Sequence, residues 1–82
     1  MEDLRARISA TDREIVELVN RRLELVAELK RYKDEHGIAF VDPEREAQLY
    51  AERAAENGGP LSDDGLRAFY TELLALTKRE VG

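Results

Sequence analysis

The sequence predicts an all-α fold, with three helices in each chain and two chains intertwined in a homodimer. Apolar residues recur at spacings of three and four along most of the 82 residues, which is the period of a helix with one buried face. Two breaks, at residues 37–43 and 57–60, divide the chain, and each contains Gly and Pro. The first of the three segments is also too long for its own chain to cover.

The first helix is predicted from about residue 3 to residue 36. No Pro or Gly interrupts this segment, and His36-Gly37 is typical of a helix end. One face of the helix carries a stripe of apolar residues, namely Leu4, Ile8, Ile15, Leu18, Leu25 and Leu29.

The second helix, about residues 43–56, begins at Asp42-Pro43. The Asp side chain can accept hydrogen bonds from free N–H groups, and Pro suits the first helical position. The third helix, about residues 62–80, begins at Ser62, an N-cap residue that two aspartates follow. Its predicted buried stripe consists of Leu66, Phe69, Tyr70, Leu73, Leu74 and Thr77.

The length of the first helix predicts the dimer. A helix of about 33 residues is roughly 50 Å long, whereas a compact chain of this size has a radius of gyration of roughly 12 Å. The two shorter helices cover parts of the long helix and leave a broad apolar face bare. A second long helix is the simplest cover, so we expect an obligate homodimer in which residues 1–82 form a single domain.

The composition argues against several classes of function. The chain has no Cys and one His, His36, so we expect neither a disulfide nor a metal site. A net charge of −5 leaves no basic surplus for the phosphates of nucleic acids. No segment approaches transmembrane length, and the N-terminus has no apolar run like that of a signal peptide. We therefore expect a cytoplasmic protein that binds neither nucleic acid nor membrane.

Two cations interrupt the apolar face of the first helix. Arg22 lies between Leu18 and Leu25, and Lys33 returns to nearly the same face eleven residues later, while Arg5 lies at its edge. An unpaired buried charge costs on the order of several kcal/mol, and the nearby acids of this helix point to the opposite side. Arg22 therefore needs an anion from another helix, another chain or a ligand. Alternatively, the aliphatic stems of these side chains are buried, and their charged head groups reach water or pair with a Glu.

A second polar cluster lies at the start of the second helix. Arg45 and Glu46 occupy its first turn, directly after Asp42-Pro43. A solvated, capped helix start is one interpretation, but a helix N-terminus that carries an Arg is also a good anion site. Together with Arg22 and Lys33, this cluster would form a cationic pocket in an acidic protein, which suits a small molecule with two carboxylates.

The run from Leu4 to Glu46 resembles the all-helical, AroQ-class (type II) chorismate mutases. The matching residues lie at the spacing of that family: Leu4-Arg5, Ile8, Asp12, Arg22, Lys33 and Asp42-Pro43-Glu44-Arg45-Glu46. The resemblance extends over the whole chain and implies an intertwined helical dimer with two active sites. It also implies that the protein catalyses the rearrangement of chorismate to prephenate, a step toward phenylalanine and tyrosine. That rearrangement is pericyclic, so no nucleophile, metal or cofactor is expected.

The resemblance also implies roles for the charged residues. Arg22 and, from the other protomer, Arg5 would hold the two carboxylates of the substrate. Lys33 would donate a hydrogen bond to the ether oxygen. Glu46, with the backbone near Asp42, would hold the ring hydroxyl. On this interpretation Lys33, Arg22 and Glu46 are the catalytic residues.

The remaining implied contacts come from Arg45 and the third helix. Arg45 and the loop before it would close over the substrate. Thr77 falls at a position that is often Ser in the family and contacts a carboxylate. Val81 falls where Gln or Glu usually supplies a second donor to the ether oxygen, and valine cannot donate. Either Lys33 acts alone, or the helix shifts, or the substrate preference differs.

Other interpretations stay open. Isochorismate–pyruvate lyases and 4-amino-4-deoxychorismate mutases look similar, although Glu46 after Arg45 favours the mutase over the lyases, in which we expect an apolar residue. A non-catalytic dimerisation or regulatory module would share the apolar stripes but gives no reason for Arg22 and Lys33 to interrupt them. The chain is also compatible with one domain of a larger bifunctional enzyme.

Overall fold

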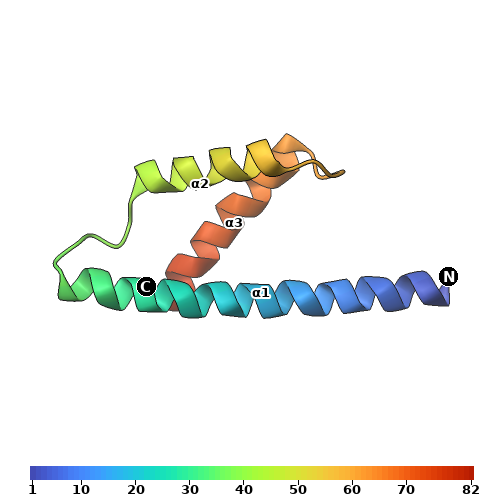
Figure 1. The fold of residues 1–82 in the computed structure, drawn as a ribbon, viewed down its shortest axis with the longest axis horizontal. Helices are drawn as coiled ribbons and strands as arrows, with labels where there is room; N and C mark the ends of the chain where they lie inside the picture. The colour runs from blue at the N-terminus through green and yellow to red at the C-terminus, as the bar shows by residue number, and fades with distance from the viewer.

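The computed structural model describes all residues from 1 to 82 and contains three helices and no strand. The helices are α1 (Glu2–Glu35), α2 (Pro43–Glu56) and α3 (Asp63–Val81). The prediction of an all-α chain with three helices is therefore confirmed. With 34 residues, α1 forms the long axis of the molecule, which extends over 53 Å (Figure 1).

The third helix connects the other two in space. In Figure 1, α2 runs roughly along α1, and α3 crosses obliquely from the end of α2 to α1. Close backbone contacts join α3 to α1 and to α2, but none joins α1 directly to α2. The positions of α1 and α2 relative to each other therefore depend on α3 and on the loop of residues 36–42.

A Schellman motif ends α1. The amide of Ile38 donates to the carbonyl of Lys33 at 2.8 Å, and the amide of Gly37 donates to that of Asp34 at 3.4 Å. This geometry requires the left-handed backbone of Gly37, whose φ of 66° favours a residue without a Cβ. The predicted stop at His36-Gly37 is confirmed, and the motif turns the chain back just beyond Lys33.

Side-chain caps begin the two shorter helices. Asp42 Oδ1 accepts a hydrogen bond from the amide of Arg45 at 3.1 Å, and a proline occupies the first helical position. Ser62 Oγ accepts one from the amide of Gly65 at 3.0 Å. Both predicted caps are confirmed. Leu61 lies against the start of α3, where a Cβ at Gly65 would lie 2.9 Å from Leu61 Cδ1.

Polar contacts hold α3 against α2. Asn57 Nδ2 donates to the carbonyl of Leu61 at 2.8 Å, and the Tyr50 hydroxyl donates to that of Asp63 at 3.4 Å. The Arg67 guanidinium lies 4.4 Å from the centre of the Tyr50 ring, which is a cation–π geometry. These contacts fix the start of α3 on α2 and so direct its C-terminal half toward α1.

The single chain buries few side chains. Leu66 and Thr77 are its only buried residues, and its radius of gyration of 15.4 Å exceeds the roughly 12 Å of a compact chain of this length. The long helix carries a row of large apolar side chains that are about half exposed, namely Leu4, Ile8, Ile15, Leu18, Leu25 and Leu29. The predicted bare apolar face is therefore present on the chain by itself.

One part of the predicted core is wrong for the single chain. Phe69 belongs to the predicted buried stripe of the third helix, yet its side chain is 50% exposed. Helix periodicity identifies an apolar face but does not show which segment covers it, and within this chain nothing covers that part of α3. None of the three helices is both long enough and apolar enough to cross a membrane.

Candidate active site

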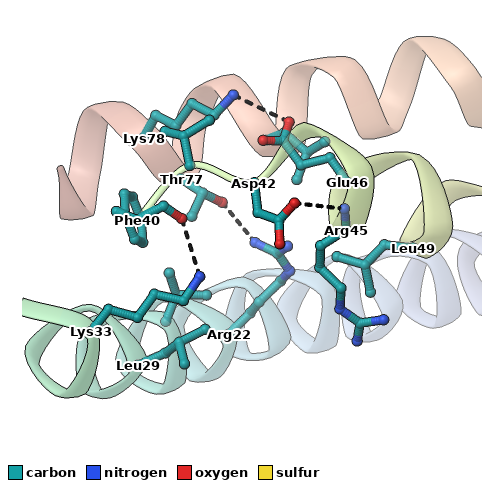
Figure 2. A pocket seen from close by; sticks show the side chains of 13 residues that line it. Arg22, Leu29, Lys33, Phe40, Asp42, Arg45, Glu46, Leu49, Thr77 and Lys78 are labelled. Carbon is teal, nitrogen blue, oxygen red and sulfur yellow. Dashed lines mark hydrogen bonds and ion pairs between the residues drawn. The ribbon is translucent and has the colours of Figure 1, made fainter. Parts of the chain in front are cut away.

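A cavity of about 210 Å³ lies where the three helices and the loop after α1 meet. Each of these segments contributes to its wall (Figure 2). The lining residues are Arg22, Val26, Leu29 and Lys33 from α1, Phe40, Val41 and Asp42 from the loop, Arg45, Glu46 and Leu49 from α2, and Leu74, Thr77 and Lys78 from α3.

Arg22 enters the cavity without a carboxylate partner. Its Nη1 donates to the hydroxyl of Thr77 at 2.7 Å, and that hydroxyl donates in turn to the carbonyl of Leu73 at 2.7 Å. Thr77 is only 4% exposed, so this contact orients the half-buried guanidinium from the side of α3. A hydroxyl is neutral, and none of the ion pairs of the chain includes Arg22. The positive charge is held in place but is not compensated.

Lys33 also lines the cavity without a carboxylate partner. Its Nζ donates to the backbone carbonyl of Phe40 at 3.3 Å and takes part in no ion pair. The Schellman motif makes this contact possible, because it returns the loop toward the helix that carries Lys33. The ammonium of Lys30 lies 5.8 Å from the centre of the Phe40 ring and adds a second contact to the same loop residue.

The first turn of α2 presents charges that are partly engaged already. The carboxylate of Asp42 caps the helix, so it faces the amide of Arg45. The guanidinium of Arg45 donates to Gln48 at 3.3 Å and lies 3.8 Å from a carboxylate oxygen of Glu52. Figure 2 shows Arg45 extending past Leu49 at the edge of the cavity, so Arg45 is less free than Arg22 to bind an anion.

Glu46 lies on the opposite side of the same turn. Its Oε1 is 3.2 Å from Nζ of Lys78, which comes from α3 (Figure 2). One carboxylate oxygen is thereby engaged, and the other is left for a further hydrogen bond. Lys78 and Glu46 lie across the cavity from Arg22 and Lys33, and their opposite charges balance each other.

The chemistry of the cavity is that of an anion receptor. Two uncompensated cations extend into a space whose other walls are mainly aliphatic or aromatic, and attraction between charges is stronger there than in bulk water. A planar guanidinium suits a carboxylate, and a lysine ammonium acts as a point donor. No group of three or more His, Cys, Asp or Glu side chains in the chain is placed to hold a metal ion.

The cavity brings together all but two of the site residues named from the sequence. Arg22, Lys33, Asp42, Arg45, Glu46 and Thr77 line it. Arg5 does not, since it is an exposed residue near the N-terminal end of α1, which projects beyond the other helices (Figure 1). Val81 does not line it either, because the α3 wall ends one turn earlier, at Lys78.

Lys78 is the charged lining residue that sequence reasoning missed. Its signal was present, because Leu74, Thr77 and Lys78 follow the i, i+3, i+4 spacing of one helix face. A Lys near the C-terminal end of a helix also has an ordinary explanation in the helix dipole. The ion pair with Glu46 joins residues 32 positions apart and could not be read from periodicity.

Comparison with known proteins places the chain in one family. The sequence profile of the family described as chorismate mutase type II matches residues 4–81. The chain is 42% identical over 80 residues to the T-protein of Haemophilus influenzae, a match that covers 92% of this chain and 21% of that protein. It is 36% identical over 55 residues to the 4-amino-4-deoxychorismate mutase of Streptomyces venezuelae, covering 67% of this chain and 52% of that protein.

Solved structures agree with these matches. The fold is similar to that of the chorismate mutase of Thermus thermophilus in its form II structure, with a TM-score of 0.91 and 33% sequence identity. That match covers 95% of this chain and 89% of the other. The form I structure gives a TM-score of 0.90 at 34% identity, covering 93% of this chain and 95% of the other. From the sequence profile and the shared fold, we conclude that the chain belongs to the type II chorismate mutase family.

Proposed function

We propose that the chain catalyses the rearrangement of chorismate to prephenate, a step toward phenylalanine and tyrosine. The observation that carries the proposal is the pair of uncompensated cations, Arg22 and Lys33, that α1 directs into one largely apolar cavity. We further propose that residues 1–82 act as one catalytic domain in the cytoplasm, where amino acids are made. The chain spans 21% of the length of the Haemophilus T-protein, so this proposal concerns the chain alone.

The reaction needs a folded substrate and stabilisation of negative charge on the breaking ether oxygen. Arg22 and the partner protomer's Arg5 hold the two carboxylates and so select the reactive conformer. Lys33 donates to the ether oxygen, on which charge grows in the transition state. Its present acceptor, the carbonyl of Phe40, is neutral, so exchange for an oxygen that becomes anionic is favourable.

The ring hydroxyl of the substrate is assigned to the first turn of α2. The free oxygen of Glu46 accepts a hydrogen bond from this hydroxyl, and the backbone beside Asp42 adds a further polar contact. Thr77 keeps Arg22 oriented toward a carboxylate. Arg45 closes over the substrate from the edge of the cavity. Val81 supplies no donor, so the ether oxygen depends on Lys33.

A homodimer completes the proposed site. The accessible surface of the chain is 6526 Å², whereas a compact monomer of 9.4 kDa exposes roughly 5,000 Å². The excess, roughly 1,500 Å², is in the range that each subunit of an obligate dimer buries. The apolar row of α1 is the natural interface, and a second α1 packed antiparallel along it would bring its Arg5 toward this cavity.

The direct test is an assay of the purified protein with chorismate. We expect chorismate absorbance to fall and prephenate to form without pyruvate. Pyruvate release would instead identify an isochorismate–pyruvate lyase when isochorismate is supplied. Absence of turnover on chorismate at micromolar enzyme, in a protein whose circular dichroism is helical, would contradict the proposal.

A second candidate function keeps the fold and changes the ring substituent. The observation that favours it is the similarity to the 4-amino-4-deoxychorismate mutase of Streptomyces venezuelae. The same assay with 4-amino-4-deoxychorismate decides between the two, because the ratio of kcat/KM for the two substrates identifies the preferred one.

Replacement of Lys33 by Ala is expected to lower kcat by about 10²–10³, because it removes the donor to the developing charge. The fold should persist, since the only hydrogen bond of the Lys33 side chain is to a loop carbonyl. Arg31→Ala is the matched control, an exposed cation of the same helix that does not line the cavity. Steady-state kinetics and circular dichroism measure both effects, and wild-type turnover in Lys33→Ala would remove its assigned role.

Replacement of Arg22 by Met separates an enzyme from a structural dimerisation module. Met keeps much of the packing and removes a half-buried charge that has no carboxylate partner, so the free energy of unfolding should hold or rise. Turnover should nevertheless collapse, because a substrate carboxylate loses its clamp. A marked loss of stability, seen as a lower urea midpoint, would show that Arg22 instead stabilises the folded protein.

Mixing two inactive variants tests whether the sites are shared. Arg5→Ala and Lys33→Ala homodimers should each be nearly inactive. After unfolding together and refolding, heterodimers contain one site with both substitutions and one with neither. About a quarter of wild-type activity should return, as statistical exchange requires. If mixing restores nothing while exchange is demonstrated by mass spectrometry, Arg5 does not come from the partner.

A further inference from the structure

We propose that Lys78 determines substrate specificity, because its ion pair with Glu46 makes the site prefer a ring hydroxyl to a ring ammonium. This inference rests on the proposed function, which assigns Glu46 to the ring hydroxyl. Lys78 acts through Glu46 and is therefore a positioning residue. The spacing of Leu74, Thr77 and Lys78 places Lys78 on the cavity face of α3, but its pairing with Glu46 is seen only in the structure.

The contact joins two walls of the cavity. Nζ of Lys78, from the last turns of α3, lies 3.2 Å from Oε1 of Glu46, in the first turn of α2. Both residues line the cavity, and Figure 2 shows their side chains directed at each other. Every other ion pair of the chain joins residues of the same helix, so this is its one ion pair between helices.

The helices do not need this pair to pack. The side chains of Lys78 and Glu46 are 44% and 25% exposed, and a partly exposed ion pair of this kind contributes little to stability. α3 is already fixed on α2 by the hydrogen bonds of Asn57 and Tyr50 and by the stacking of Arg67 on Tyr50. The better explanation for a charge at this position is its effect on what binds beside Glu46.

The pair offers one hydrogen-bond acceptor and little net charge. Lys78 donates a hydrogen bond to one oxygen of the Glu46 carboxylate, and the second oxygen can accept a hydrogen bond from a hydroxyl. A ring amine is protonated near neutral pH. It would meet a carboxylate whose charge is already balanced and a lysine ammonium that repels it. A neutral hydroxyl meets no such repulsion. The lysine therefore disfavours the substrate with a ring ammonium and leaves an acceptor for the substrate with a ring hydroxyl.

The experiment compares kcat/KM for chorismate and 4-amino-4-deoxychorismate in the wild type and in Lys78→Met. Loss of the cation leaves Glu46 as an uncompensated carboxylate, and the ratio should shift by about tenfold toward the amino substrate. If the amino compound is not turned over, its inhibition constant against chorismate should fall by a similar factor. Lys78→Gln should shift the ratio in the same direction and provides a second variant if Lys78→Met folds poorly.

Two controls separate charge at this position from charge in general. Lys78→Arg keeps a cation that can pair with Glu46 and should keep the wild-type preference. Arg79→Met removes a neighbouring exposed cation of α3 that does not line the cavity, and it should leave the ratio within about twofold of the wild type. A shift as large in Arg79→Met as in Lys78→Met would overturn the proposal.

The outcomes also separate this inference from the function on which it rests. A wild-type enzyme that converts chorismate, together with an unchanged ratio in folded Lys78→Met, would refute the role of Lys78 and leave the function intact. If the ion pair were merely structural, Lys78→Met would lower the melting temperature and leave the ratio unchanged. That result would also refute the role of Lys78. A wild-type protein that converts neither compound would overturn the proposed function, and this inference would fall with it.

Discussion

The hydrogen bond from Arg22 to the hydroxyl of Thr77 is the contact on which the site depends. It holds a guanidinium in a half-buried position with a neutral partner, so the charge keeps most of its capacity to attract an anion. A carboxylate in place of Thr77 would neutralise Arg22 and close the site to a dianion. A purely apolar neighbour would leave the guanidinium without orientation. A hydroxyl that is itself anchored to the carbonyl of Leu73 avoids both.

The rest of the fold brings the other groups to this contact. The Schellman motif at Gly37 turns the loop back so that the carbonyl of Phe40 holds Lys33. The cap at Asp42 begins α2 where its first turn faces the cavity. The contacts between α2 and α3 then set the crossing of α3 over α1, which places Thr77 against Arg22. Local backbone chemistry therefore decides the geometry of a site whose members are far apart in sequence.

The sequence predicted those features that depend on neighbours along the chain. Caps at Asp42 and Ser62, the stop at Gly37 and the apolar periodicity predicted the helices, and the interruption of that periodicity singled out Arg22 and Lys33. Thr77, Glu46 and Arg45 came from family resemblance as much as from chemistry. The pairing of Lys78 with Glu46 depends on the crossing of two helices, which no local pattern determines. The exposure of Phe69 depends on what covers α3, which a single chain does not reveal.

The central claim is that Arg22 and Lys33 are positive charges kept available for a substrate with two carboxylates. It is tested most directly by a crystal structure with a bound dicarboxylate ether that mimics the transition state. We predict that Arg22 contacts a ligand carboxylate and that Nζ of Lys33 leaves the carbonyl of Phe40 for the ligand's ether oxygen. A complex in which either cation points to bulk solvent or pairs with a carboxylate of the protein, with the ligand bound elsewhere, would contradict it.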